Sequence, residues 1–162
     1  EANLDLASPL PKFNFFDTSA PIYTRSRYLP PSKLHGCDID NSMVSEGCIL
    51  NGVRVRKSIV GLRSRIDEGV DIEDSIVMGS DFFESMSEIG WNIKNNRPHI
   101  GIGEKTKIRR AIIDKNVRIG KNVQLLNNDN VQNYDSPDRT YFIRDGIIII
   151  PKNETIADGT VI

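Results

Sequence analysis

Histidine and cysteine are scarce in this chain, with two of each among 162 residues. The spacing of Cys37 and Cys48 matches no zinc-binding motif, and no second cysteine pair accompanies them. We therefore expect two buried thiols rather than a disulfide or half of a metal site. A reducing compartment follows from that expectation.

The chain also lacks an excess of charge of either sign and any long apolar run. Its 21 basic and 22 acidic residues give a net charge of −1, so no overall field draws it to nucleic acid or to a membrane. No apolar run approaches transmembrane length, since residues 147–150 form only a short buried-strand signal. Residues 1–10 have the pattern of neither a signal peptide nor a transit peptide.

What the chain does contain is a repeated motif: a small residue, any residue, then an aliphatic residue. Successive aliphatic members lie five or six residues apart, which fits neither the 3.6-residue period of a helix nor one continuous strand. Glycine or asparagine often precedes the small member, and these residues enter the left-handed backbone region at least cost. In residues 37–77 the pairs are Cys37/Ile39, Ser42/Val44, Cys48/Leu50, Val53/Val55, Ser58/Val60, Ser64/Ile66, Val70/Ile72 and Ser75/Val77.

Short strands joined by sharp corners every six residues predict an all-β fold, a left-handed parallel β-helix of about five coils. With three hexads per coil, one ladder stacks Ile39, Val55 and Ile72, and another stacks Val44, Val60 and Val77. The repeat resumes with the pairs Ile100/Ile102, Thr106/Ile108, Ala111/Ile113, Val117/Ile119 and Val123/Leu125.

Two excursions interrupt the predicted β-helix. We expect residues 78–99 to leave the coils with a short helix inside residues 81–93, and residues 127–140 to form a second, polar excursion. Residues 141–150 should return as a strand. Excursions between coils are the usual way in which such a fold accommodates insertions.

The region before the repeat is different in kind. Residues 1–8 could be the tail of a helix, and dense prolines interleaved with aromatic residues then exclude a regular helix. We therefore divide the chain into residues 1–33, an extended linker from a missing N-terminal domain, and residues 34–162, the β-helix. The absence of an initiator methionine agrees with a fragment.

No catalytic constellation stands out. Gly101-Ile102-Gly103 lacks the third glycine of a nucleotide-binding loop, and no βαβ unit surrounds it. His35 and His99 are too few for the three metal ligands of a hexapeptide-repeat carbonic anhydrase. A hexapeptide-repeat acyltransferase needs a single basic histidine, so His99 keeps that function as the alternative.

Basic residues are concentrated between positions 105 and 121, and none occupies a predicted inward position. They form either a solvated outer face or a site for a phosphorylated anion, since lysine and arginine are natural partners of phosphate oxygens. These residues are Lys105, Lys107, Arg109, Arg110, Lys115, Arg118 and Lys121.

Four segments resemble a known protein family more specifically than the hexapeptide pattern alone does. Together these segments extend over essentially the whole chain. They are APIYTRSRYLPPS (residues 20–32), SIVGLRSR (58–65), RAIIDKNVRIG (110–120) and IADGTVI (156–162). All four closely resemble the C-terminal part of ADP-glucose pyrophosphorylase, also called glucose-1-phosphate adenylyltransferase, of the plant and cyanobacterial type.

The resemblance implies a function for the full-length protein. Enzymes of this family make ADP-glucose and pyrophosphate from ATP and glucose 1-phosphate for starch or glycogen synthesis. Their nucleotidyltransferase domain, with its Mg²⁺, precedes this region, so the fragment alone is expected to hold no cofactor and to be inactive. The implied partners are that catalytic domain, the other subunits of a homo- or heterotetramer, and the effectors 3-phosphoglycerate and phosphate. The implied location is the plastid stroma in a plant or alga and otherwise the cytoplasm.

The same resemblance implies which residues bind the effector. Lys115, Lys152, Arg27 and Arg25 match family positions that line an anion pocket. The chain departs from the family pattern at Asp145, where serine is usual, and this acid is expected to weaken effector binding. Further departures are Val117, where alanine is usual, and Asn133-Tyr134, where Glu-Ala is usual. The sequence of residues 147–150 resembles that of the family's large, regulatory subunit more than that of its small subunit.

Overall fold

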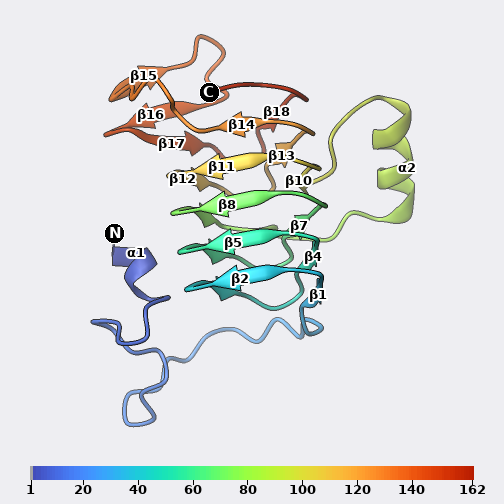
Figure 1. The fold of residues 1–162 in the computed structure, drawn as a ribbon. Coiled ribbons are helices and arrows are strands. Elements are labelled where there is room, and N and C mark those ends of the chain that lie inside the picture. Colours follow the sequence, from blue (N-terminus) through green and yellow to red (C-terminus); the bar gives the residue numbers. More distant parts are fainter. Residues whose placement is uncertain (1) are drawn as a thin grey trace.

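The computed structural model describes residues 2–162 and shows three parallel sheets that wrap around one apolar core (Figure 1). Successive strands enter the three sheets in turn, so every third strand returns to the same sheet, one coil further along. Sheet A contains, in spatial order, β1 (Lys33–His35), β4 (Ile49–Asn51), β7 (Arg65–Ile66), β10 (Gly101–Ile102), β13 (Arg118–Ile119) and β18 (Thr155–Ile156). Sheet B contains β2 (Asp38–Asp40), β5 (Arg54–Arg56), β8 (Asp71–Glu73), β11 (Lys107–Arg109) and β14 (Gln124–Leu125).

Sheet C completes the coils and carries the one departure from parallel pairing. Its parallel part contains β3 (Met43–Val44), β6 (Ile59–Val60), β9 (Ile76–Val77), β12 (Ala111–Ile113) and β17 (Ile147–Ile150). The strands β16 (Phe142–Arg144) and β15 (Asn133–Asp135) then add in antiparallel fashion. The five complete coils confirm the predicted parallel β-helix, and β18 begins a further turn.

The predicted ladders are present in the predicted register. Ile39 pairs with Val55 and Val55 with Ile72, while Val44, Val60 and Val77 stack in sheet C. Val55, Ile72, Val60 and Val77 are buried and Ile39 and Val44 of the first coil are partly buried, because alternate residues of each strand point to the core side of the sheet. Complete burial of an aliphatic side chain contributes about 1.5–3 kcal/mol, so the stacked ladders are the main source of the stability of the fold.

The corners form three stacked rows of residues with positive φ, one row between each pair of sheets. Asn116 and Asn122, which directly precede the small members Val117 and Val123 of the repeat, stand at corners with φ values of 61° and 55°. The row between sheets C and A, called here the C–A corner, contains Gly47, Arg63, Asn116 and Asn153. The sequence did not reveal Arg63, because arginine has no intrinsic preference for this conformation. Stacking on the neighbouring coil imposes it, as Arg63 N donates to Glu46 O at 3.2 Å.

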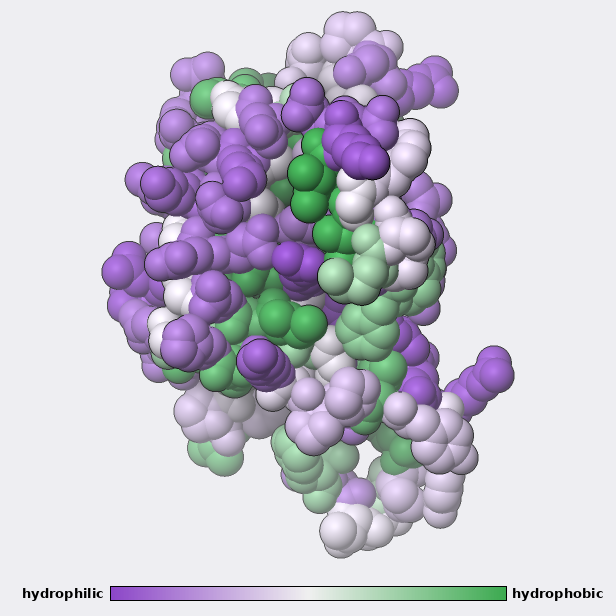
Figure 2. All heavy atoms as spheres, turned by 90° about the vertical axis from the view of Figure 1, so that its right-hand side faces the viewer, coloured by the Kyte–Doolittle hydropathy of each residue, from purple (hydrophilic) through white to green (hydrophobic). Residues whose placement is uncertain are grey.

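The first excursion contains the predicted helix, α2 (Met86–Lys94), which stands beside the coils (Figure 1). Ser85 begins it with a capping box, in which its side chain accepts from Glu88 N and the Glu88 side chain accepts from Ser85 N. Figure 2 looks at this side of the molecule and shows apolar patches among polar side chains. The exposed large apolar residues of the excursion are Phe82, Phe83, Met86, Trp91 and Ile93.

The prediction for residues 141–150 was wrong, because they form two antiparallel strands rather than one. β16 and β17 are joined by a turn at Asp145 and Gly146, whose φ values are 50° and 74°. Two successive residues with positive φ are typical of tight hairpin turns, and Asp-Gly is a favoured pair at this position. β15 then extends the hairpin from within the polar excursion at residues 127–140.

The N-terminal region has little regular structure. It begins with α1 (Ala2–Asp5), consistent with the expected end of a helix, and then runs irregularly to Ser32. Its aromatic side chains are exposed, including Phe16 at 84% and Tyr23 at 92%. Its division from the β-helix as a linker to another domain stays a prediction.

Both cysteines are free, as predicted. Cys48 is buried and Cys37 is half-buried against the core. Burial raises the pKa of the Cys48 thiol. Both thiols therefore fill space inside the coils, and the reducing compartment stays a prediction.

Candidate functional site

The C–A corner brings Lys115 and Lys152 together from distant parts of the sequence. Each lysine directly precedes a corner asparagine, Asn116 or Asn153, and these asparagines are 37 residues apart in the chain. In the sequence β15 and β16 lie between these two corners, but in space the corners belong to neighbouring coils and stack directly. Asn153 N donates to Lys115 O at 3.0 Å. Equivalent atoms in neighbouring coils are about 4.8 Å apart, which places the two lysine side chains side by side.

Both lysines bind one carboxylate, that of Asp81. Lys115 Nζ lies 2.9 Å from Asp81 Oδ1, and Lys152 Nζ lies 2.7 Å from Asp81 Oδ2. Asn116 fixes Asp81 further, because its Oδ1 accepts from Asp81 N at 2.8 Å and its Nδ2 donates to Asp81 Oδ2 at 3.2 Å. We call this group, together with Asn153, the lysine pair site.

The position of Asp81 follows from the glycine two residues before it. Gly79 has φ of 86°, and a Cβ atom there would lie 2.1 Å from Leu62 O, so only glycine fits. The chain turns out of the coil at this point, immediately before the α2 excursion. Asp81 was not a predicted site residue, because nothing in the repeat pattern indicates where a residue of an excursion will lie.

The two lysine charges of the lysine pair site are partly neutralised by the Asp81 carboxylate. Hydrogen bonds from Lys152 and then from Lys115 hold the pKa of Asp81 far below its usual value. The hydrogen bond and charge of Asp81 in turn raise the pKa of Lys152. The three side chains are 37–48% exposed, so an anion from solution can reach both ammonium groups.

The structure does not bring Arg25 and Arg27 to the lysines. Both arginines are exposed, and residues 2–162 show no hydrogen bond or ion pair that joins either one to the lysine pair site. Gly47 N donates to Pro30 O at 2.9 Å, so their segment enters at the first-coil end of the same C–A corner. Lys115 lies four coils further along, at about 4.8 Å per coil and so about 19 Å away.

Arg118 corrects the expectation that all seven basic residues of positions 105–121 reach solvent. Its side chain is only 10% exposed and forms an ion pair with the equally buried Glu84, with 2.7 Å between Nη2 and Oε1. Its Nη1 donates to Pro98 O at 2.7 Å. Arg118 does point away from the core, but the α2 excursion covers it, and no repeat pattern could reveal that cover.

His99, the candidate base of the acyltransferase alternative, has both ring nitrogens engaged. Nδ1 lies 2.8 Å from Ile100 O, which can only accept, and Nε2 lies 2.8 Å from Asp67 Oδ2. Burial alone would raise the pKa of Asp67, but the hydrogen bond and charge of His99, aided by Arg65, outweigh it and lower that pKa. The ring ties the end of the excursion to sheet A, and this arrangement offers no free nitrogen for proton abstraction.

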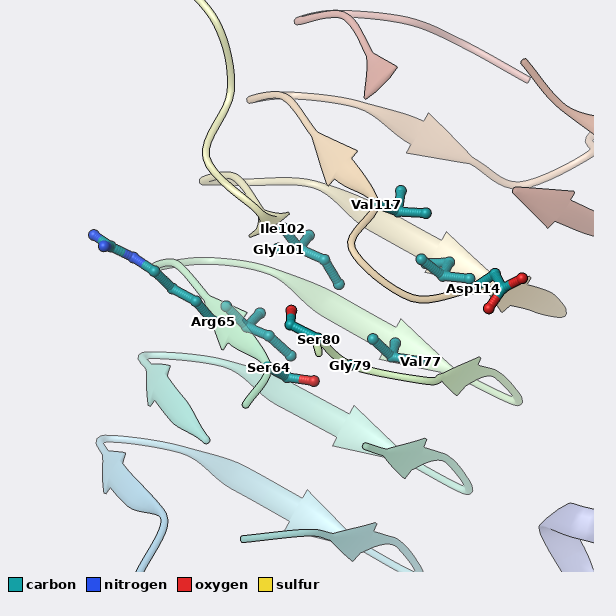
Figure 3. A pocket seen from close by; sticks show the side chains of 11 residues that line it. Ser64, Arg65, Val77, Gly79, Ser80, Gly101, Ile102, Asp114 and Val117 are labelled. Atoms are coloured by element: carbon teal, nitrogen blue, oxygen red, sulfur yellow. The ribbon is translucent and has the colours of Figure 1, made fainter. Parts of the chain in front are cut away.

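The cavity behind the C–A corner is too small to hold a cofactor. The cavity behind the C–A corner, lined by Ser64, Ser80 and Val117 among others, measures about 10 Å³ (Figure 3). Such a volume holds one water molecule at most. Residues 2–162 contain no cluster of three or more histidine, cysteine, aspartate or glutamate side chains placed to hold a metal ion. Across that same range, no helix combines the length and apolar character needed to cross a membrane.

Comparison with protein families agrees with the stacked coils. The model of the GLGC left-handed parallel β-helix domain matches residues 27–161. The chain therefore belongs to this family, which is the C-terminal domain of ADP-glucose pyrophosphorylase. The coils form a left-handed parallel β-helix, as predicted. The family is that of glucose-1-phosphate adenylyltransferases, transferases of glycogen and starch biosynthesis.

Proposed function

We propose that this chain is the regulatory and assembly part of an enzyme that makes ADP-glucose and pyrophosphate from ATP and glucose 1-phosphate. Chemistry at the phosphates would take place in a nucleotidyltransferase domain joined to residues 1–33, which would bind Mg²⁺. The β-helix would join subunits into a tetramer and respond to phosphorylated effectors such as 3-phosphoglycerate and phosphate. In a plant or alga the enzyme would act in the plastid stroma.

The lysine pair site is the observation that supports effector binding. Two ammonium groups from neighbouring coils already bind the two oxygens of one carboxylate, at 2.9 and 2.7 Å. A phosphate group presents oxygens at similar spacing and carries more charge. The same pair of lysines therefore has the geometry to bind the phosphate of an effector at the protein surface.

Single and double alanine variants of the lysines test this proposal. In the assembled enzyme we expect Lys115→Ala and Lys152→Ala each to raise the effector concentration for half-activation about tenfold, the effect of losing one charge-assisted hydrogen bond. Lys57→Ala removes an exposed corner lysine outside the site and should change nothing. Unchanged activation curves in both single variants and the double variant would remove the effector site from this subunit.

Arg27 and Arg25 have a different proposed role in effector binding from that of the two lysines. Because their segment lies at the first-coil end of the C–A corner, we propose that they join the effector only in the assembled enzyme. Arg27→Ala should then weaken activation of the assembled enzyme while leaving the binding of inorganic phosphate to this chain unchanged. Weakened phosphate binding to the isolated chain would contradict that division of roles.

A further inference from the structure

We infer that Asp81 is an internal competing ligand of the lysine pair site, and that a phosphate dianion binds there by displacing the Asp81 carboxylate. The inference rests on the proposed effector function and adds to it how the site is kept closed. Asp81 lies outside the stacked coils, at the start of the α2 excursion, so its place on the two lysines is not imposed by the repeat.

The geometry makes the displacement specific to one side chain. Both Asp81 oxygens are used by the lysines, and Asn116 Nδ2 makes a third contact. All three donors would remain in place if the carboxylate rotated away, because Lys115, Asn116 and Lys152 stand on stacked corners. The backbone of Asp81 is held separately by Asn116 Oδ1, at 2.8 Å from Asp81 N. A side-chain rotation alone therefore opens the site.

The charges explain why a dianion can replace Asp81. In the closed state Lys115 and Lys152 face Asp81, and Asp114, whose Oδ1 accepts from Lys115 N at 2.6 Å, stands next to them. Two positive and two negative charges leave no net attraction for a further anion. A phosphate dianion brings two charges against the single charge of Asp81, so it gains more from the same two ammonium groups.

Protonation of Asp81 cannot open the site at the pH values at which phosphate changes its charge. The Asp81 pKa lies far below that range, because both lysines favour the ionised form. The pH dependence of binding should therefore come from the ligand. Phosphate should bind more weakly below its second ionisation, near or somewhat above pH 6 for a phosphate group, whereas sulfate, which does not titrate there, should be unaffected.

The test measures binding of inorganic phosphate and of sulfate to this chain by isothermal titration calorimetry at low ionic strength. Asp81→Asn keeps the shape of the side chain and its backbone contact but removes the charge. We expect it to bind both anions more tightly by the same factor, about fivefold, because an exposed carboxylate shared by two lysines no longer competes for them. Asp81→Ser should tighten binding in the same direction, so the result does not depend on one variant.

A matched control separates local competition from overall charge. Glu104→Gln also removes one carboxylate from an ion pair with a corner lysine, Lys121, at 3.1 Å and similar exposure. This variant should bind both anions as the wild type does. An equal gain in Glu104→Gln would assign the effect to net charge and overturn the inference.

The remaining outcomes distinguish this inference from the proposed function. If Lys115→Ala and Lys152→Ala weaken phosphate binding but Asp81→Asn does not tighten it, the site stands and Asp81 is no competitor. If the lysine variants leave phosphate binding unchanged, the site itself is wrong. If Asp81→Asn binds phosphate more tightly and the double variant with Lys115→Ala loses that gain, the result supports both the phosphate site and the role of Asp81 as its competitor.

Discussion

Two of the segments that lie outside the coils, the α2 excursion and the N-terminal segment, differ in how firmly they are held. The α2 excursion, residues 78–99, is bound to the coils near both ends, by Glu84 to Arg118 and by His99 to Asp67. The N-terminal segment, residues 2–32, makes hydrogen bonds to the coils only through Pro30 and Ser32, among the residues that the structure describes. Both segments are rich in exposed aromatic residues, so apolar content does not explain the difference.

The comparison shows what fixes a non-repeating segment to a repeating fold. The Glu84–Arg118 and His99–Asp67 attachments of the excursion each involve ionisable side chains that also have a second partner. Glu84, for example, accepts from Asn92 Nδ2 at 2.7 Å and from Ile100 N at 2.8 Å in addition to Arg118. Buried polar groups have few acceptable arrangements, because an unsatisfied one is costly. Such contacts therefore select one conformation, whereas exposed aromatic rings do not.

The largest expected effect comes from damage to the coils to which both segments attach. Ile66 is 1% exposed, and Ile66→Asp would bury an unpaired carboxylate at a cost of several kcal/mol. We expect this variant, and Ile113→Asp likewise, to be unfolded by circular dichroism. Phe16→Asp, in the N-terminal segment at 84% exposure, should keep the wild-type Tm. A wild-type Tm for Ile66→Asp would show that the assigned register is wrong.

A smaller effect should separate the two segments. Arg118→Ala leaves the buried Glu84 carboxylate unpaired, which typically costs about 3–5 kcal/mol. We expect faster hydrogen exchange in residues 78–99 of this variant and unchanged exchange in residues 2–32. Arg109→Ala breaks an exposed pair with Glu73, 3.6 Å apart, and should cost less than about 1 kcal/mol. Equal loss of stability in the two variants would show that the Glu84 contact does not hold the excursion.

The smallest effect is a pH dependence at the other attachment of the excursion. The folded-state pKa of Asp67 is lowered, so its contribution to stability is present above its unfolded pKa of about 3.9. That contribution is lost as the pH falls through the lower, folded value. The difference in Tm between wild type and Asp67→Asn should therefore shrink on acidification below about pH 4.

Asp17 provides the matched comparison in the N-terminal segment. Its pKa is also lowered, by hydrogen bonds from Ser19 two residues away, but it is fully exposed. Such a local contact needs no coil, so Asp17→Asn should leave Tm unchanged at every pH. A pH-dependent change in Asp17→Asn equal to that in Asp67→Asn would remove the distinction between the two segments.

Much of the fold was predictable because the repeat is a local property of the sequence. Small and aliphatic residues at fixed spacing defined the strands, and Ile39, Val55 and Ile72 stack as the hexads required. The excursion helix was also predictable from local signals. The β16–β17 hairpin was not predicted, although Asp145-Gly146 is itself a turn signal, because the apolar residues on both sides of this pair favour one continuous strand.

The sequence by itself determined the stacked coils and the corner asparagines, because the repeat depends only on residues within a few positions of one another. It also placed Lys115 and Lys152 next to such corners. Only the tertiary structure decided that these two lysines share Asp81 and that the α2 excursion covers Arg118. It also decided that the segment of Arg25 and Arg27 meets the coils at the opposite end of the C–A corner, where Gly47 N donates to Pro30 O. The physical reason is that stacking has a fixed period of about 4.8 Å, which the repeat encodes. The path of an excursion depends instead on which buried polar partners it meets, and these partners lie far away in the sequence.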